Sequence, residues 1–332
     1  MLRILINCPG GWSHGLDSPE RGEGRWAQNV TRCLAKSGRY DVSACSGGFP
    51  TWGRGDVVPN VAILSEQGAN RRGPYDLYFD AAWYDKKIPA AEAKYNFHVH
   101  FGYEPRLGVP FPENHYLVYV LRAARPNYFR EGCGNADRTF YLPTPFNDQM
   151  VAPDPSRRRI IHTMRGSDAP GRLNRFEQLY EVVTRLRNEQ EIPFTWISSV
   201  GLEEPRHPQD RVLAMDKAWG IPYNELRAEV RECGLNAALD GWSNTLDAMS
   251  LGVPSLVWTG GVDSSAYGVA EKYDLLLEPG SSTDRLYDVV SRLFHDPKLY
   301  VAYTRDIQDV FQDHLESRVL ALFDEMVAEV VR

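Results

Sequence analysis

Short apolar runs alternate along the chain with stretches in which apolar residues recur at helical spacing. The run from Leu2 to Asn7 ends in Cys-Pro-Gly-Gly, a pattern typical of a buried strand followed by a loop. From Arg25 to Ser37 the apolar residues predict a helix, which Ser37-Gly38 ends before a strand-like run at 41–44. A strand, a helix and a second strand in this order predict a parallel pair with a right-handed crossover.

The rest of the first half continues this pattern and predicts a doubly wound α/β domain. Further strands are expected at 57–64, 77–81, 95–101, 116–120 and 139–142. A stretch marked by prolines then separates this half from a fresh strand at 159–164. We therefore place one Rossmann-like domain at 1–146 and a linker at 147–158.

The second half repeats the alternation. Strands at 159–164, 194–200, 237–239 and 255–258 alternate with helices at about 173–189, 222–233 and 243–251. This pattern predicts a second Rossmann-like domain at 159–305. The final segment carries its apolar residues on one helical side, which predicts a C-terminal helix at 306–332 that packs on either domain.

The size and composition support two packed domains. At 332 residues the chain exceeds the length at which one core usually stops growing, and 43% of the residues are hydrophobic. No apolar run reaches the roughly 18 residues that a membrane span needs, and the start lacks the layout of a signal peptide. We therefore expect a cytoplasmic protein.

The charge and the cysteines argue against several classes of function. The net charge is −7 and the acidic surplus lies in the second half, which disfavours a broadly basic surface for nucleic acid. The five cysteines are odd in number, widely spaced and without histidines at zinc-ligand spacing, so neither disulfides nor structural zinc are expected. Basic and aromatic residues that interleave between 71 and 130 form either a solvated face or a local site for an anionic acceptor.

Ligands of open parallel sheets bind at the carboxyl ends of the strands, where helix N-termini present free N–H groups. The glycine-rich stretch from Pro9 to Gly24 lies at such a position, and Gly22 and Gly24 precede the first predicted helix. Glycines there allow a phosphate to approach the backbone, although the spacing matches neither a Rossmann nor a Walker motif. A loop that needs glycines only for its turns is the alternative.

The segment Asp240-Gly-Trp-Ser-Asn-Thr-Leu-Asp247 is the most informative one. Ser243 or Asn244 is expected near the cap of a helix, with Asp247 in the first turn. The N–H groups and hydroxyls of such a terminus suit a diphosphate, and a carboxylate one turn further accepts hydrogen bonds from a ribose diol. The alternative is that Ser243 caps the helix and Asp247 complements the helix dipole.

The run from Ala238 to Val257 resembles the donor-binding segment of the GT-B glycosyltransferases. The shared pattern is acidic-Gly-aromatic, then Leu-acidic-Ala and Gly-x-Pro, and the glycine loop before the first helix is similar as well. The resemblance implies two Rossmann-like domains facing a cleft and a C-terminal helix that crosses back to the N-terminal domain. It also implies a nucleotide-sugar donor in the C-terminal domain and an acceptor in the N-terminal domain.

Carried over residue by residue, the resemblance implies donor-binding roles in the C-terminal domain. Asp247 would hold the ribose, Ser243, Asn244 and the adjacent Thr245 would lie by the diphosphate, and Asp240 would lie near the donor sugar. The two aspartates are separated by six residues, whereas retaining members have two glutamates separated by seven. The Gly-x-Thr-Thr-x-x-Asp pattern of the inverting O-linked N-acetylglucosamine transferases fits Gly241 to Asp247 about as well, so the stereochemistry stays open.

Cations and a histidine complete the expected site. Similar enzymes neutralise the donor diphosphate with an Arg and a Lys after the first strand of the second domain, where this chain offers Arg165 and then Arg172 or Arg175. His100 ends a predicted strand where the family commonly has a histidine that contacts the donor sugar. Asp17, Glu20 and Glu104 lie in loops and are the candidates for a base that deprotonates the acceptor.

The hypothesis from the sequence is a metal-independent glycosyltransferase that needs no cofactor and uses a UDP-sugar as co-substrate. The acceptor is a glycan, a small molecule or an anionic polymer such as modified DNA. A nucleotide-sugar epimerase of the same fold and a non-catalytic nucleotide-sugar-binding protein are the alternatives.

Overall fold

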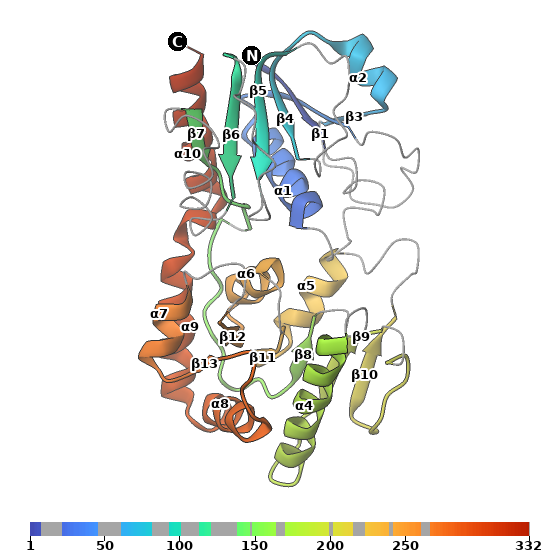
Figure 1. Ribbon diagram of the computed structural model, residues 1–332, viewed down its shortest axis with the longest axis vertical. Coiled ribbons are helices and arrows are strands. Elements are labelled where there is room, and N and C mark those ends of the chain that lie inside the picture. The colour runs from blue at the N-terminus through green and yellow to red at the C-terminus, as the bar shows by residue number, and fades with distance from the viewer. Residues whose placement is uncertain are drawn as a thin grey trace. The chain divides into compact units, whose positions relative to one another are not determined.

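The computed structural model divides the chain into two compact units, Met1–Asp148 with Asp313–Arg332 and Gln149–Gln312 (Figure 1). The domain and linker boundaries that the sequence pattern predicts, at residues 146, 158 and 305, stay predictions. The residues that the structure describes are 1–7, 22–45, 61–81, 93–100, 113–120, 138–146, 148–163, 170–198, 202–214, 223–238, 242–259 and 266–331.

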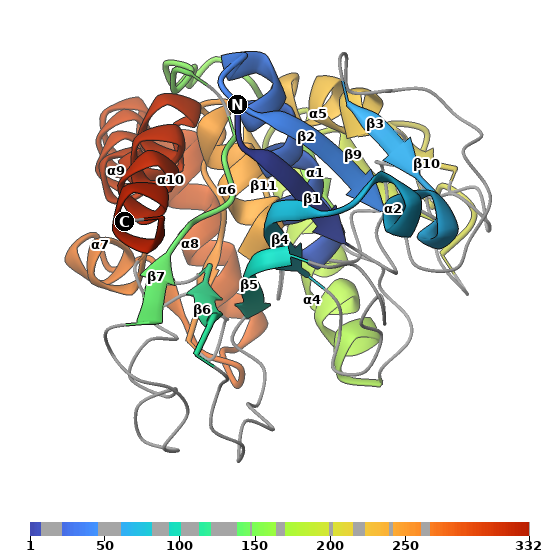
Figure 2. The ribbon, with the colours of Figure 1, turned by 90° about the horizontal axis from the view of Figure 1, so that it is seen from above.

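The described part of the first unit is built on a seven-stranded parallel sheet with the order β3-β2-β1-β4-β5-β6-β7 (Figure 2). This is the Rossmann order, in which the chain reverses direction across the sheet between β1 and β4. The strands are β1 (Arg3–Asn7), β2 (Asp41–Cys45), β3 (Ala62–Leu64), β4 (Tyr75–Asp80), β5 (Ala93–His100), β6 (His115–Tyr119) and β7 (Thr139–Tyr141).

Helices cover both faces of this sheet, as a doubly wound fold requires. On one face, Trp26 of α1 (Gly22–Ser37) and Phe323 of α10 (Glu316–Val330) both pack on Phe79 of β4, with ring centroids 6.3 and 5.7 Å away. On the other face, Ala69 of α2 (Glu66–Arg72) joins a cluster with Leu5. The C-terminal helix therefore packs on the N-terminal unit, which confirms the crossing back that the resemblance implies.

The second unit repeats the strand order of the first. Its described strands form a four-stranded parallel sheet, β10-β9-β8-β11, and a parallel pair, β12-β13. A bridge between Asn236 and Ser255 links the two sets, so the order along the sheet again reverses after the first strand. The strands are β8 (Ile160–His162), β9 (Phe194–Ile197), β10 (Asp210–Leu213), β11 (Leu235–Asn236), β12 (Val257–Trp258) and β13 (Leu276–Leu277).

Helices flank this second sheet on both faces as well. Phe176 of α4 packs edge-on against Trp196 of β9 on one face, and α5 and α6 pack against Ile161 on the other. The predicted fold class, two doubly wound α/β domains, is therefore confirmed. The helices are α4 (Pro170–Arg187), α5 (Tyr223–Arg231), α6 (Trp242–Ser250), α7 (Tyr267–Lys272), α8 (Thr283–His295) and α9 (Pro297–Val310).

The prediction of one continuous helix at the C-terminus was wrong. Helix α9 ends at Val310, a 3-10 turn follows at Gln312–His314, and α10 begins at Glu316. The buried His314 bonds the carbonyl oxygen of Thr144 through Nδ1 at 2.8 Å, and its own carbonyl oxygen accepts the Phe146 amide at 2.9 Å. These two hydrogen bonds fix the chain where it passes from the second unit into the first.

The edge strand β10 was missed because its four residues, Asp-Arg-Val-Leu, show no clear alternation. An ion pair holds it in place: Asp210 pairs with Arg187, both side chains are buried, and the Tyr180 hydroxyl donates to the same carboxylate at 2.9 Å.

Within the described ranges, no helix combines the length and the apolar character that crossing a membrane requires.

Gly252 fixes the end of α6 to the segment that enters the second unit. The amide of Val253 donates to Ala248 and that of Gly252 to Met249, which is a Schellman motif with Gly252 at φ +73°. A Cβ at this position would lie 2.5 Å from the carbonyl oxygen of Ala152. The glycine of the Gly-x-Pro pattern is therefore required by backbone geometry.

We predict that Gly252→Ala lowers the free energy of unfolding by about 2 kcal/mol or more, because the left-handed conformation is strained and the backbone contact must open. Urea unfolding measures the loss. Gly280→Ala is the matched control, since a Cβ there meets nothing within 4 Å. Equal unfolding midpoints for the two variants would contradict this account.

Candidate functional site

Buried side chains tie together the strands from which the candidate site is built. Asn236 at the end of β11 accepts a hydrogen bond from Thr163, which follows β8, and donates one to Ser255, each at 3.0 Å. All three residues are buried, and the Tyr303 hydroxyl adds a bond to the Ser255 carbonyl oxygen at 3.0 Å. Because β8 and β11 flank the point where the strand order reverses, this network lies where open α/β sheets bind their ligands.

The loops that leave these strands carry part of the predicted site. Arg165 lies between β8 and α4, and Asp240 lies between β11 and α6, and both are outside the described residues. The proposed bases Asp17, Glu20 and Glu104 are outside them as well. Their assignments stay predictions from the sequence.

Helix α6 begins at Trp242, so Ser243, Asn244 and Thr245 form its first turn. The side chains of Ser243 and Asn244 are outside the described set, and Thr245 is half-buried. The placement of Asp247 in the first turn was wrong, because the helix begins before Ser243 and Asp247 is its sixth residue. Asp247 therefore lies about one helical turn below the N-terminal amides.

Asp247 pairs with an arginine that the sequence pattern did not single out. Its Oδ1 lies 3.4 Å from Nη1 of Arg227 on α5, and the two side chains are 7% and 17% exposed. No local motif marks Arg227, because only the packing of α5 against α6 brings it to Asp247. The structure thus makes Asp247 one half of a buried ion pair.

Arg175 and Trp258 lie together near the same edge of the sheet. The guanidinium of Arg175 on α4 lies over the ring of Trp258, 5.6 Å from its centroid, and Trp258 is the last residue of β12. Arg172 lies one turn earlier on α4, and its side chain is outside the described set. Of the two arginines proposed as the second cation, Arg175 is therefore the one that the structure places beside a described strand end.

The first unit has its own polar pair where its strand order reverses. Asn7, which ends β1, donates through Nδ2 to the Tyr78 hydroxyl at 3.0 Å and to Asp80 at 3.4 Å, and Asp80 ends β4. His100 is the last residue of β5, in register with Tyr119 of β6. The expected position of His100 at a strand's carboxyl end is confirmed, and its contact with a sugar stays a prediction.

The prediction that Gly22 and Gly24 lie in a loop was wrong, because α1 begins at Gly22. The apolar periodicity that located this helix starts only at Trp26, so it could not detect the first turn. The two glycines lie instead at the N-terminus of α1. Any phosphate bound there would meet helix N–H groups in place of a glycine loop.

Two of the described cysteines, Cys33 and Cys233, are poorly suited to nucleophilic chemistry. Burial raises the pKa of the Cys33 and Cys233 thiols to about 12, so both stay protonated near neutral pH. Within the described ranges, no group of three or more His, Cys, Asp or Glu residues could hold a metal ion.

Solved structures share this fold over 99% or more of the chain, and two of the three that follow are glycosyltransferases by name. They include a sucrose-phosphate synthase from Thermosynechococcus elongatus (12% identity, 99% of this chain and 100% of that chain, TM-score 0.63). A glycosyltransferase from Rickettsia africae (11%, 100% and 99%, TM-score 0.61) and the calicheamicin glycosyltransferase CalG4 (11%, 100% and 100%, TM-score 0.55) match as well. No protein-family model and no curated protein sequence matches the chain. At these identities the likeness establishes the GT-B fold.

We predict that Asn236→Ala lowers the free energy of unfolding by about 3 kcal/mol, because it leaves the buried Thr163 and Ser255 hydroxyls without their shared partner. Urea unfolding measures the change. Asn188→Ala, at an exposed position after α4, serves as the control and should stay within about 0.5 kcal/mol of the wild type. A loss below about 1 kcal/mol for Asn236→Ala would contradict a structural role for this network.

Proposed function

We propose that the protein is a glycosyltransferase that transfers a sugar from a nucleoside-diphosphate sugar, UDP-linked, to an acceptor hydroxyl. The observation that carries this proposal is the position of Asp247. A buried carboxylate follows the first turn of α6, beside the point where the strand order of a GT-B unit reverses. A helix N-terminus for the diphosphate and a carboxylate for the ribose diol are the two groups that recognition of a nucleoside diphosphate requires.

The proposed reaction breaks the bond between the anomeric carbon and the diphosphate oxygen and forms a bond to the acceptor oxygen. The nucleoside diphosphate leaves with the bonding electron pair, and the acceptor proton passes to a base. The leaving diphosphate gains negative charge, which arginines and helix N–H groups stabilise. We assign this role to Arg175 together with Arg165 or Arg172 and the amides of Ser243, Asn244 and Thr245, without a metal or a cofactor.

The acceptor belongs to the first unit in this proposal, with His100 at the carboxyl end of β5 as the residue closest to the chemistry. A histidine can take up a proton or contact the sugar. The acceptor is a glycan, a small molecule or an anionic polymer such as modified DNA. Asp240 is assigned to the donor sugar.

We expect Asp247→Asn to weaken UDP binding about tenfold, because a neutral amide is a poorer acceptor for two ribose hydroxyls than a carboxylate. Isothermal titration calorimetry with UDP measures the affinity. The matched control is Asp309→Asn, which changes an exposed aspartate of α9 and should leave the affinity unchanged. An unchanged UDP affinity in Asp247→Asn would refute the ribose assignment.

A second experiment tests the activity itself. The protein is incubated with UDP-, GDP-, ADP- and dTDP-sugars, with and without EDTA, and the products are separated by mass. We expect UDP release from a UDP-sugar that EDTA does not reduce, together with transfer once an acceptor is supplied. An epimerised sugar without an acceptor would identify an epimerase, and binding without any release of UDP would identify a non-catalytic binding protein.

A further inference from the structure

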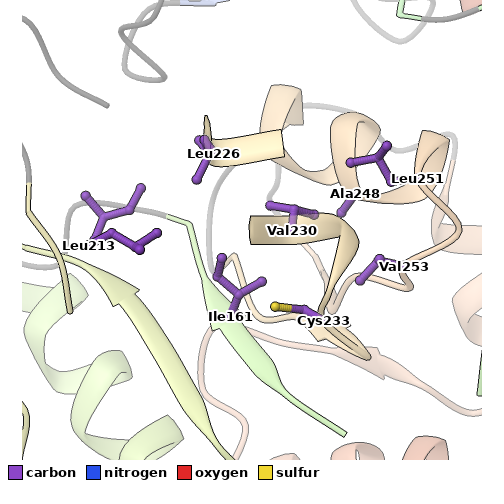
Figure 3. Packing of buried hydrophobic residues seen from close by; sticks show 9 residues of the cluster. Ile161, Leu213, Leu226, Val230, Cys233, Ala248, Leu251 and Val253 are labelled. Carbon is purple, nitrogen blue, oxygen red and sulfur yellow. The ribbon is translucent and has the colours of Figure 1, made fainter. Parts of the chain in front are cut away.

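Helices α5 and α6 pack through an apolar cluster that holds them in a fixed relation (Figure 3). Leu226 and Val230 of α5 and Ala248 of α6 belong to this cluster, with Leu251 just after α6. Figure 3 shows the two helices side by side over Ile161 of β8. Since Arg227 adjoins Leu226 and Asp247 adjoins Ala248, the Arg227–Asp247 pair lies beside this cluster.

The environment of this ion pair makes a purely stabilising role a poor explanation. Both side chains are largely removed from water, 17% and 7% exposed, so each lost hydration energy on folding. The attraction between two such charges roughly offsets that loss, and apolar replacements of buried pairs are often neutral. The adjoining residues Leu226 and Ala248 show that apolar side chains pack well here. A contribution to folding stability alone therefore does not account for the charges of Arg227 and Asp247.

The contact with Arg227 reaches Asp247 through one of its carboxylate oxygens. Nη1 of Arg227, on α5, lies 3.4 Å from Oδ1 of Asp247. A guanidinium that contacts one carboxylate oxygen limits rotation of the carboxylate plane. A carboxylate in a fixed orientation is what a vicinal diol needs in order to donate two hydrogen bonds to it.

We propose that Arg227 is a positioning residue that holds Asp247 in the orientation that distinguishes ribose from deoxyribose. The proposal rests on the proposed function, in which Asp247 receives the ribose of a nucleoside diphosphate. Arg227 acts through Asp247 and makes no contact of its own with the ligand. Removal of the Arg227 side chain therefore changes the discrimination between ribose and deoxyribose more than it changes the affinity for the diphosphate.

The test compares the affinities for UDP, 2′-deoxy-UDP and 3′-deoxy-UDP by calorimetry. We expect wild type to prefer UDP by about tenfold or more over each deoxy analogue. Arg227→Met and Arg227→Gln should bring both ratios down to about threefold or less, and Arg227→Lys, which keeps the charge, should retain more than either. Arg231→Met changes an exposed arginine on the same helix and should keep the wild-type ratios.

The outcomes separate this proposal from the proposed function. Wild-type ratios in Arg227→Met, or in Arg227→Gln where the methionine variant does not fold, would overturn the role of Arg227 and leave the glycosyltransferase proposal standing. Wild type that binds UDP and both deoxy analogues equally would overturn the ribose assignment of Asp247 and the role of Arg227 together. Wild type that binds no UDP would overturn the proposed UDP donor and, with it, this inference.

Discussion

A buried asparagine at the reversal of the strand order is the constraint on which the second unit depends. Asn236 cannot turn to water, so its amide must bond inside the protein, and it does so with Thr163 after β8 and Ser255 before β12. Three segments distant in sequence are thereby held in register by side chains as well as by their backbones. The first unit meets the same constraint with Asn7, Tyr78 and Asp80. In both units, buried polar side chains therefore bond to one another at the strand ends where the strand order reverses.

The positions of the helices follow from these fixed strand ends. Helix α6 starts after β11 and ends in the Schellman turn at Gly252, whose missing side chain admits the carbonyl oxygens of Val151 and Ala152. Gln308 of α9 donates to the carbonyl oxygens of both Val151 and Met249 at 2.8 Å, which holds the same corner from another side. With both ends of α6 determined, the place of Asp247 is determined as well. The glycine of the Gly-x-Pro part of the motif thus serves the backbone geometry.

The elements that the sequence predicted well carry a local apolar pattern. Helices α1, α4, α5 and α6 have apolar residues at helical spacing, as Trp26 of α1 illustrates, and strands such as β4 are apolar runs buried on both faces. Two of the features that it missed depend on partners far along the chain. Strand β10 is held by the pair of Asp210 with Arg187, and the break after α9 is imposed by hydrogen bonds between His314 and the segment from Thr144 to Phe146. Local periodicity carries no information about such partners.

The residues of the candidate site also differ in whether the local sequence could reveal them. The resemblance of the segment from Gly241 to Asp247 drew attention to the carboxylate, because this motif is local in sequence; its donor-binding role stays a prediction. Arg227 could not be found in this way, since it is 20 residues from Asp247 and meets it only through the packing of Leu226, Val230 and Ala248. The motif therefore reveals one half of a buried ion pair, and only the fold supplies the other half.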